Sequence, residues 1–394
     1  MLETLSIPYE LAWPFAIAIG WVAGEFGHRW TGLPRISLYG LVGFLLANTQ
    51  IGFLPKAADS NMLVLADVAF GLILFELGYR INLHWLKVNP WIGASSVAEA
   101  LGTFAVVYYI ATWYGAPTMT ALLLASLAMS TSPAGILRVI NEQSSSGQVT
   151  ERALHLSALN SVMAVFAFKV IIGYWLFQSS GSILKAGWNS LVELILSALL
   201  GALFGVLIPA LRRRLGNVGS DATVGFAIGV ILLVALSHAL HFSPILSTLT
   251  FGLVARHRRE TLSQTQRNFG VLGDLLVIPL FIFVATTLEW QQALAGIGLG
   301  LLLIVARILA KIVGVTLFSR VSGISWRKGL LTGLALSPAS VFAILMLEQT
   351  RFLQIDLISH LAPLAAMVLV MEVIGPILTQ RALIWARETS SEEN

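Results

Sequence analysis

The sequence predicts an all-α polytopic membrane protein of about 13 transmembrane helices, with two inverted-topology repeats and crossed, discontinuous helices. Composition is the first indication, because 57% of the 394 residues are hydrophobic and only 11% are charged. Soluble domains carry about 25% charged residues. The second indication is a series of apolar runs of about 20 residues, the length that spans a bilayer. The third is a Ser-Pro pair deep inside two of these runs.

Thirteen apolar runs are the expected spans. The ninth run is short, and Pro244 beside its start predicts an irregular beginning. The first run is followed at once by further spans, so we interpret it as a membrane helix rather than a signal peptide. The spans lie near 9–27, 34–54, 62–82, 90–114, 117–140, 153–178, 187–211, 219–240, 243–256, 268–288, 292–317, 329–349 and 359–386.

Lysines and arginines predict the orientation. Of the 24 in the chain, eighteen fall on the side reached after odd-numbered spans, and only Lys56, Lys185 and Arg351 fall on the other. Short loops rich in Lys and Arg face the cytoplasm. The sequence therefore predicts a bacterial-type inner-membrane protein with its N-terminus outside and its C-terminus cytoplasmic. The pI near 9.5 then reflects topology, and no nucleic-acid partner is expected.

The two Ser-Pro pairs indicate an internal repeat. Ser132-Pro133 lies in the fifth span and Ser337-Pro338 in the twelfth, and these two spans run in opposite directions. Their separation by seven spans predicts the organisation of the chain. We expect a first inverted repeat over 1–178 (spans 1–6), a linking span 7 over 179–215, a second repeat over 216–387 (spans 8–13) and a short cytoplasmic tail over 388–394.

Pro133 and Pro338 are therefore expected to break their helices. A proline within the membrane frees a backbone carbonyl, and lipid cannot satisfy that carbonyl. Two breaks in equivalent places of inverted repeats are typical of secondary transporters, in which half-helix ends face a site at the midplane. The alternative is a pair of ordinary proline kinks.

Several segments resemble those of the cation:proton antiporter superfamily, the sodium/hydrogen exchanger-like membrane domain. The similarity covers most of the chain, in the family's order. It implies a six-helix core domain that moves against a dimerisation domain, a homodimer, and exchange of Na⁺ or K⁺ for H⁺. The segments that carry it are 34–53, 71–83, 131–142, 278–284, 307–314 and 334–345.

The chain departs from that family at one position. Antiporters of the family carry an Asp-Asp or Asn-Asp pair on the helix after the first crossing helix, and here the pair reads Asn160-Ser161. A serine stays neutral at any accessible pH, so it cannot bind a cation and a proton in turn. Neutral oxygens can still replace part of an ion's hydration shell. The candidate ion-binding or substrate-binding residues are Thr131, Ser132, Asn160, Ser161 and Ser337.

The proton carrier is then expected elsewhere. Glu76 in the third span and Glu372 in the thirteenth are the candidates, since charged residues inside a membrane usually mark ion or proton pathways. Each has an alternative role as the structural partner of a buried cation.

Three cations inside spans are expected to balance charge. Arg307 and Lys311 are four residues apart on one helical face, so they repel unless an acid lies between them or Lys311 snorkels inward. By the resemblance, Arg307 stabilises the broken helices. Lys169 either supplies a positive charge near the site or is paired with a carboxylate.

Three functions remain open from the sequence. The first is a secondary active Na⁺/H⁺ or K⁺/H⁺ antiporter with a relocated carboxylate and atypical coupling. The second is a transporter of another solute or an anion on the same scaffold, and the third is a non-transporting sensor or scaffold subunit. The expected partners are the transported ion or small solute, protons and lipid.

An enzyme is not expected. The chain has no HExxH, GxSxG or glycine-rich phosphate motif. It also has no cysteine, so thiolate chemistry is excluded. We expect no cofactor and no metal other than a transported Na⁺ or K⁺.

Overall fold

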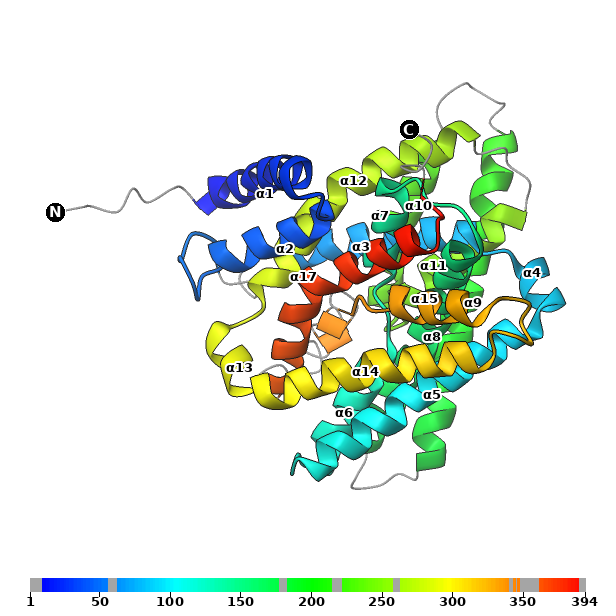
Figure 1. Ribbon diagram of the computed structural model, residues 1–394. Helices are drawn as coiled ribbons and strands as arrows, with labels where there is room; N and C mark the ends of the chain where they lie inside the picture. The colour runs from blue at the N-terminus through cyan, green and yellow to red at the C-terminus, as the bar shows by residue number, and fades with distance from the viewer. Residues whose placement is uncertain are drawn as a thin grey trace.

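The computed structural model describes residues 9–55, 62–176, 183–214, 222–257, 263–339, 343–344, 346–347 and 361–389, and all regular structure in these residues is helical (Figure 1). Lys56, Arg351, the boundaries expected at 178–179 and 215–216, and tail residues 390–394 lie outside them. The helices are α1 (Tyr9–Thr31), α2 (Arg35–Leu46), α3 (Met62–Arg80), α4 (Leu83–Val88), α5 (Pro90–Trp113), α6 (Thr118–Met129), α7 (Pro133–Glu142), α8 (Gln148–Leu176), α9 (Ile183–Arg214), α10 (Ala222–Ala239), α11 (Pro244–His257), α12 (Ser263–Thr286), α13 (Trp290–Ala295), α14 (Ile297–Leu317), α15 (Trp326–Ala335) and α17 (Ala362–Trp385).

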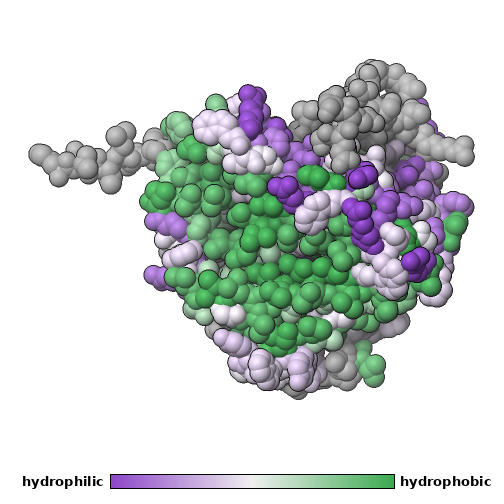
Figure 2. All heavy atoms as spheres, in the orientation of Figure 1, coloured by the Kyte–Doolittle hydropathy of each residue, from purple (hydrophilic) through white to green (hydrophobic). Residues whose placement is uncertain are grey.

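The helices have the length and composition of membrane spans. Within the described residues, seven segments are long and apolar enough to cross a bilayer, and three further apolar helices are shorter. The segment Thr118–Glu142, which contains a break, is the most deeply buried of the seven. Figure 2 shows a broad hydrophobic band across the visible face, with hydrophilic residues gathered toward its margins. The predicted polytopic, all-α membrane fold is thus confirmed.

Some elements differ from the predicted spans. α2 ends at Leu46, short of the predicted span 34–54, because the backbone turns extended at Ala47. The six-residue helices α4 and α13 precede α5 and α14 and were not predicted. Asn82 begins α4, since its side chain accepts hydrogen bonds from the backbone N–H groups of the next turn.

The described helices pack as two groups. α5, α6, α7, α8, α14, α15 and α17 pack around the breaks in the chain, and α1, α2, α3, α9, α10, α11 and α12 pack mainly against one another. α5 and α14 run side by side along their lengths (Figure 1). Each group takes helices from both halves of the sequence, so long-range packing brings the two expected repeats together.

Close helix packing in the second group depends on glycine. Gly78 of α3 and Gly252 of α11 face each other's helices, and a Cβ on either would overlap a backbone carbonyl, that of Leu249 or of Phe75. Small residues allow such close backbone approach between membrane helices.

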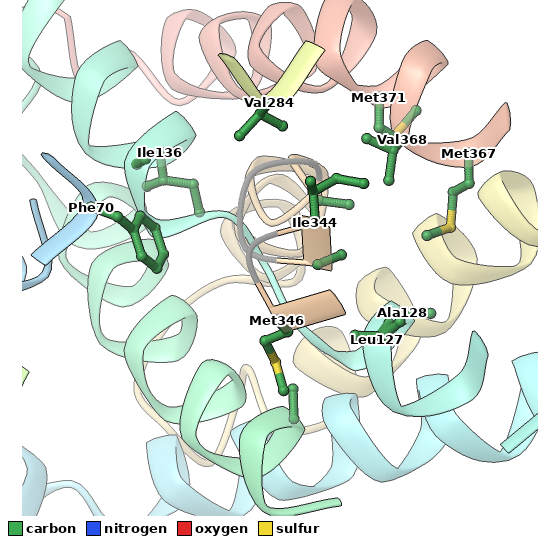
Figure 3. Packing of buried hydrophobic residues seen from close by; sticks show 14 of the residues in the cluster. Phe70, Leu127, Ala128, Ile136, Val284, Ile344, Met346, Met367, Val368 and Met371 are labelled. Carbon is green, nitrogen blue, oxygen red and sulfur yellow. The ribbon is translucent and has the colours of Figure 1, made fainter. Parts of the chain in front are cut away.

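Apolar side chains enclose the breaks in the first group. Figure 3 shows Ile344 between Ile136 of α7 and Val368 of α17, with Leu127 and Ala128 of α6 nearby. All five side chains are buried. The broken backbone is therefore shielded from lipid, as an irregular segment at membrane depth requires.

Candidate functional site

The first break separates α6 from α7. α6 ends at Met129, and α7 begins at Pro133, whose ring fits the first turn of a helix because no N–H is needed there. Ser132 caps α7, with its hydroxyl accepting a hydrogen bond of 3.2 Å from the backbone N–H of Gly135. The residues between, 130–132, are fully buried.

The second break follows α15, which ends at Ala335, and contains Pro338. The two breaks touch: the backbone N–H of Ser132 donates to the Pro338 carbonyl at 2.8 Å. The Thr131 hydroxyl donates to the Leu336 carbonyl at 3.4 Å. The two Ser-Pro segments therefore meet in space at a crossing.

Arg307 of α14 binds both sides of this crossing. Its guanidinium is fully buried and donates to backbone carbonyls at distances from 2.5 to 3.4 Å. Helix breaks leave such carbonyls without partners inside the helix. The carbonyl ends of half-helices also carry partial negative charge, so a buried cation is stabilised there. The carbonyls belong to Ala128, Ser130, Leu336, Ser337 and Pro338.

Lys311, one turn along α14, forms an ion pair with Glu99 of α5. Its ammonium group also donates to the Met129 carbonyl at 3.0 Å and to the Thr131 hydroxyl at 3.2 Å. The side chains of Lys311 and Glu99 are both 0% exposed. A charged pair this deep is expected to be functional or structurally essential, because desolvation of both groups is unfavourable.

Asn160 joins the pair to the first break. Its side-chain amide donates to the Glu99 carboxylate at 3.3 Å and to the Thr131 hydroxyl at 2.8 Å. Its carbonyl oxygen accepts from the Thr131 backbone N–H at 3.3 Å. The Ser161 hydroxyl lies 2.7 Å from the carbonyl of Ser157 and 3.3 Å from that of Thr131. Asn160 and Thr131 are therefore brought together with Glu99 and Lys311, and Ser161 lies beside Thr131.

The hydroxyls of the other two polar candidates, Ser132 and Ser337, form hydrogen bonds within their own segments. The Ser132 hydroxyl caps α7, and the Ser337 hydroxyl donates to the Leu334 carbonyl at 2.6 Å. Both residues lie at the crossing, where their backbone groups make the contacts.

Glu76 lies away from the crossing, between α3 and α7. Its carboxylate accepts from Arg80 at 3.0 Å, from Arg138 at 3.2 Å and from the Asn141 amide at 3.2 Å. The structure thus surrounds Glu76 with two cations, as the alternative role of structural partner requires.

Glu372 of α17 is buried against α2. A Cβ added at Gly40 would overlap its side chain, so a glycine is needed at that contact. One turn on, Gly375 packs against Pro338: a Cβ there would lie 2.9 Å from the proline Cα. Glu372 is therefore close to the second break along its own helix.

Lys169 is engaged outside the crossing. It forms an ion pair with Glu193 of α9, and both side chains are 25% exposed. Nothing in this arrangement directs its charge toward Ser161, two turns back along α8.

Comparison with known proteins places this geometry in a family. Residues 15–385 match the family described as sodium/hydrogen exchanger, transmembrane. The chain belongs to the sodium/hydrogen exchanger family. The resemblance predicted from the sequence is thereby confirmed, and with it membership of a transporter family.

A curated relative and two solved structures are similar to this chain. The ammonium/H⁺ antiporter subunit AmhT of Alkalihalophilus pseudofirmus is 24% identical over 321 residues, which cover 79% of this chain and 80% of the relative. The sodium proton antiporter MjNhaP1 of Methanocaldococcus jannaschii at pH 8 aligns with a TM-score of 0.67 and 17% identity over 95% of both chains. A second MjNhaP1 structure, an electron-microscopy map, gives 0.68 and 18% over 98% of this chain and 96% of the other. The chain therefore has the fold of these antiporter structures.

Sequence reasoning missed Glu99. It left open whether an acid lies between Arg307 and Lys311 or Lys311 extends toward the membrane surface, and it named no acid. Two signals were present: Glu99 lies well inside the predicted span 90–114, and the predicted repeats make that span the counterpart of the span 292–317 that carries both cations.

Within the described residues, no group of three or more His, Cys, Asp or Glu side chains is arranged to hold a metal ion. The charged and oxygen-bearing groups at the crossing come from five segments: α5, the α6–α7 break, α8, α14 and the break that follows α15.

Proposed function

We propose that the protein is a secondary antiporter that exchanges a monovalent cation for protons at the crossing of its two broken helices. The position of Glu99 is the observation that carries this proposal. Its carboxylate lies 3.3 Å from the Asn160 amide, beside the serine that stands where the family places an aspartate. Glu99 thus supplies the negative charge that Ser161 cannot.

The partners of the buried cations at the crossing favour a cation over an anion as the substrate. Arg307 is occupied by backbone carbonyls, and Lys311 by Glu99. Lys169, on which the anion alternative depended, is paired with Glu193. An anion would find at the crossing a carboxylate and oxygens that already accept hydrogen bonds.

Ammonium and potassium are the first candidate cations, with sodium as the comparison. The relative AmhT is an ammonium/H⁺ antiporter subunit by name. In this protein, Glu99 already pairs with an ammonium group, that of Lys311. Glu76 and Glu372 remain candidate proton carriers, as the sequence predicted.

The architecture belongs to the same proposal. We infer two inverted repeats over 1–178 and 216–387 joined by the span over 179–215, a homodimer, and insertion in a bacterial inner membrane with the N-terminus outside. The distribution of Lys and Arg supports this orientation, and the resemblance to antiporters supports the homodimer.

The test is cation-driven proton movement in proteoliposomes, with KCl, NaCl and NH4Cl gradients applied in turn. Glu99→Gln is expected to lower the rate to that of protein-free liposomes, because the site then has no negative charge for the cation. Glu193→Gln is the matched control, since it removes a half-buried glutamate from an ion pair outside the crossing.

Exchange at the wild-type rate in Glu99→Gln would contradict the role of Glu99. That result would favour Glu76 or Glu372 as the carboxylate that takes part in exchange. No cation-driven flux in the wild type would contradict antiport itself. That second result would favour the sensor or scaffold alternative.

A further inference from the structure

We propose that one acyl chain of a membrane phospholipid binds in an apolar groove along α8. The groove has a volume of about 710 Å³ and is bounded by α5, α6, α8 and α9. Among the described residues at the crossing, only Met129 lines it. The groove is therefore a site separate from the one that the proposed antiport uses.

The groove results from how these four helices pack. α5, α6 and α8 pack against one another, whereas α9 packs against α8, α10 and α11. The Lys169–Glu193 ion pair also joins α9 to α8. A channel is thus left along α8, with α9 on one side and α5 and α6 on the other.

The lining of the groove consists of hydrocarbon and thioether side chains. Among the described residues that line it, only Tyr174 has a polar group in its side chain, and the charged groups of Lys169 and Glu193 are not part of the lining. A cavity with so few polar partners does not hold water. Lipid tails are as apolar as leucine, so a tail can enter without removing water from any charged group.

The groove opens on the lipid-facing surface of the membrane spans. Its lining includes Leu101, Phe166 and Leu191, which are 54%, 36% and 41% exposed, as well as the buried Met129. The three exposed side chains belong to helices that are long and apolar enough to cross a bilayer. The groove is therefore continuous with the surface that already contacts lipid tails, and no aqueous ligand has comparable access to it.

The length of the groove matches one leaflet of a bilayer. On α8 the lining runs from Val162 to Tyr174, which is about 18 Å at 1.5 Å per residue. The hydrocarbon region of a bilayer is about 30 Å thick, so each leaflet contributes about 15 Å. Tyrosine side chains concentrate at the membrane interface, so the acyl chain enters beside Tyr174 and ends near Met129. With the proposed orientation, this is the outer leaflet.

The bound chain lies between the two packed groups of helices. α5, α6 and α8 belong to the group around the breaks, and α9 belongs to the other. Met129 is the last residue of α6, and its carbonyl accepts a hydrogen bond from Lys311. The end of the acyl chain therefore lies beside the first break, at a boundary that any movement of one group against the other must change.

The test is quenching of a fluorophore at the groove of the purified full-length protein in dodecyl maltoside micelles. The chain has no cysteine, so Leu191→Cys can be labelled with bimane at that position alone. Phosphatidylcholine with a spin-labelled acyl chain is the quencher. Val106→Cys is the control reporter, because Val106 is 39% exposed but does not line the groove.

Quenching at position 191 is expected to saturate as the quencher is added and to be reversed by excess unlabelled phosphatidylcholine. Quenching at position 106 is expected to rise in proportion to the quencher. Ala167→Phe, which places a ring in the groove, is expected to abolish the saturable quenching at position 191. Ala105→Phe is its matched control, since it adds the same ring to an exposed alanine outside the lining.

Quenching at position 191 that rises in proportion to the quencher, as at position 106, would overturn the proposal. Saturable quenching that Ala167→Phe leaves unchanged would overturn it too. If Ala167→Phe does not fold, Ala167→Leu fills part of the groove and is compared with Ala105→Leu, with loss of saturable quenching again expected for the first alone. The assay needs neither transport nor a sided membrane, so its failure is distinguishable from failure of the proposed antiport or orientation.

Discussion

At the scale of single residues, the crossing is organised by two cations of one helix that have different partners. Among the described residues, Arg307 donates only to backbone carbonyls, and Lys311 donates to a carboxylate as well as to backbone and hydroxyl oxygens. A guanidinium has five donors in a fixed plane and keeps its charge under all conditions, whereas a lysine can lose its proton when buried. Arg307 is therefore suited to a fixed structural charge, whereas Lys311 is paired with a carboxylate.

Arg307→Met is expected to destabilise the protein. Its removal leaves buried carbonyls of both breaks without donors, and each unsatisfied group costs about 1–3 kcal/mol. The measurement is the apparent unfolding temperature in detergent. Arg29→Ala is the control, because Arg29 is 69% exposed and pairs only with Glu25 at the surface, where such pairs contribute about 0–1 kcal/mol. Equal unfolding temperatures for the two variants would contradict the structural role of Arg307.

At the scale of elements, the site depends on how closely α5 and α14 approach. A Cβ added at Gly314 would lie 2.5 Å from the Cα of Glu99, which is shorter than any ordinary contact. The glycine thus permits the backbone approach that brings Glu99 to Lys311. The breaks themselves are local features, since Pro133 and Ser132 together determine where α7 begins.

Gly314→Ala is expected to push α5 and α14 apart and to lower both stability and cation exchange. Overpacking of this kind costs about 1–3 kcal/mol. Gly102→Ala on α5 is the matched control, since no atom lies within 4 Å of a Cβ placed there. The control is expected to be neutral or to gain about 1 kcal/mol from helix propensity. If both variants unfolded at the wild-type temperature, the tight α5–α14 contact would be in doubt.

At the scale of the whole molecule, charged contacts join the two packed groups of helices. Glu76 of α3 pairs with Arg138 of α7, and Arg35 at the start of α2 pairs with Glu142 at the end of α7 at 3.0 Å. Both pairs involve the second half of the first broken helix. Any movement of one group against the other must therefore rearrange these pairs.

The proposed orientation predicts which single cysteines a membrane-impermeant maleimide can reach. The chain has no cysteine of its own, so the unmodified protein is the blank. In right-side-out membrane vesicles, Tyr114→Cys is expected to be labelled and Lys87→Cys is not, because these exposed residues lie at opposite ends of α5. Both are expected to be labelled after the vesicles are opened. The reverse pattern would contradict an N-terminus outside.

Much of the fold could be predicted because it depends on composition and local residue types. The apolar runs predicted a polytopic helical protein, the two Ser-Pro pairs predicted the breaks, and Asn160-Ser161 predicted an atypical site. The limits of α2 and the presence of α4 were not predicted, because capping and short turns leave weak signals in an apolar sequence.

The sequence by itself determined the membrane class and the family, and it predicted that Ser161 stands in place of an aspartate. Only the tertiary structure decided which carboxylate serves the crossing, because Glu99 and Lys311 are 212 residues apart and meet through the packing of α5 on α14. The tertiary structure also determined the ion pairs of Glu76 with Arg80 and Arg138, and of Lys169 with Glu193. The physical reason is that a buried charge is stabilised by whichever partner the packing brings within a few ångströms, and the rotation of one helix against another is not encoded locally.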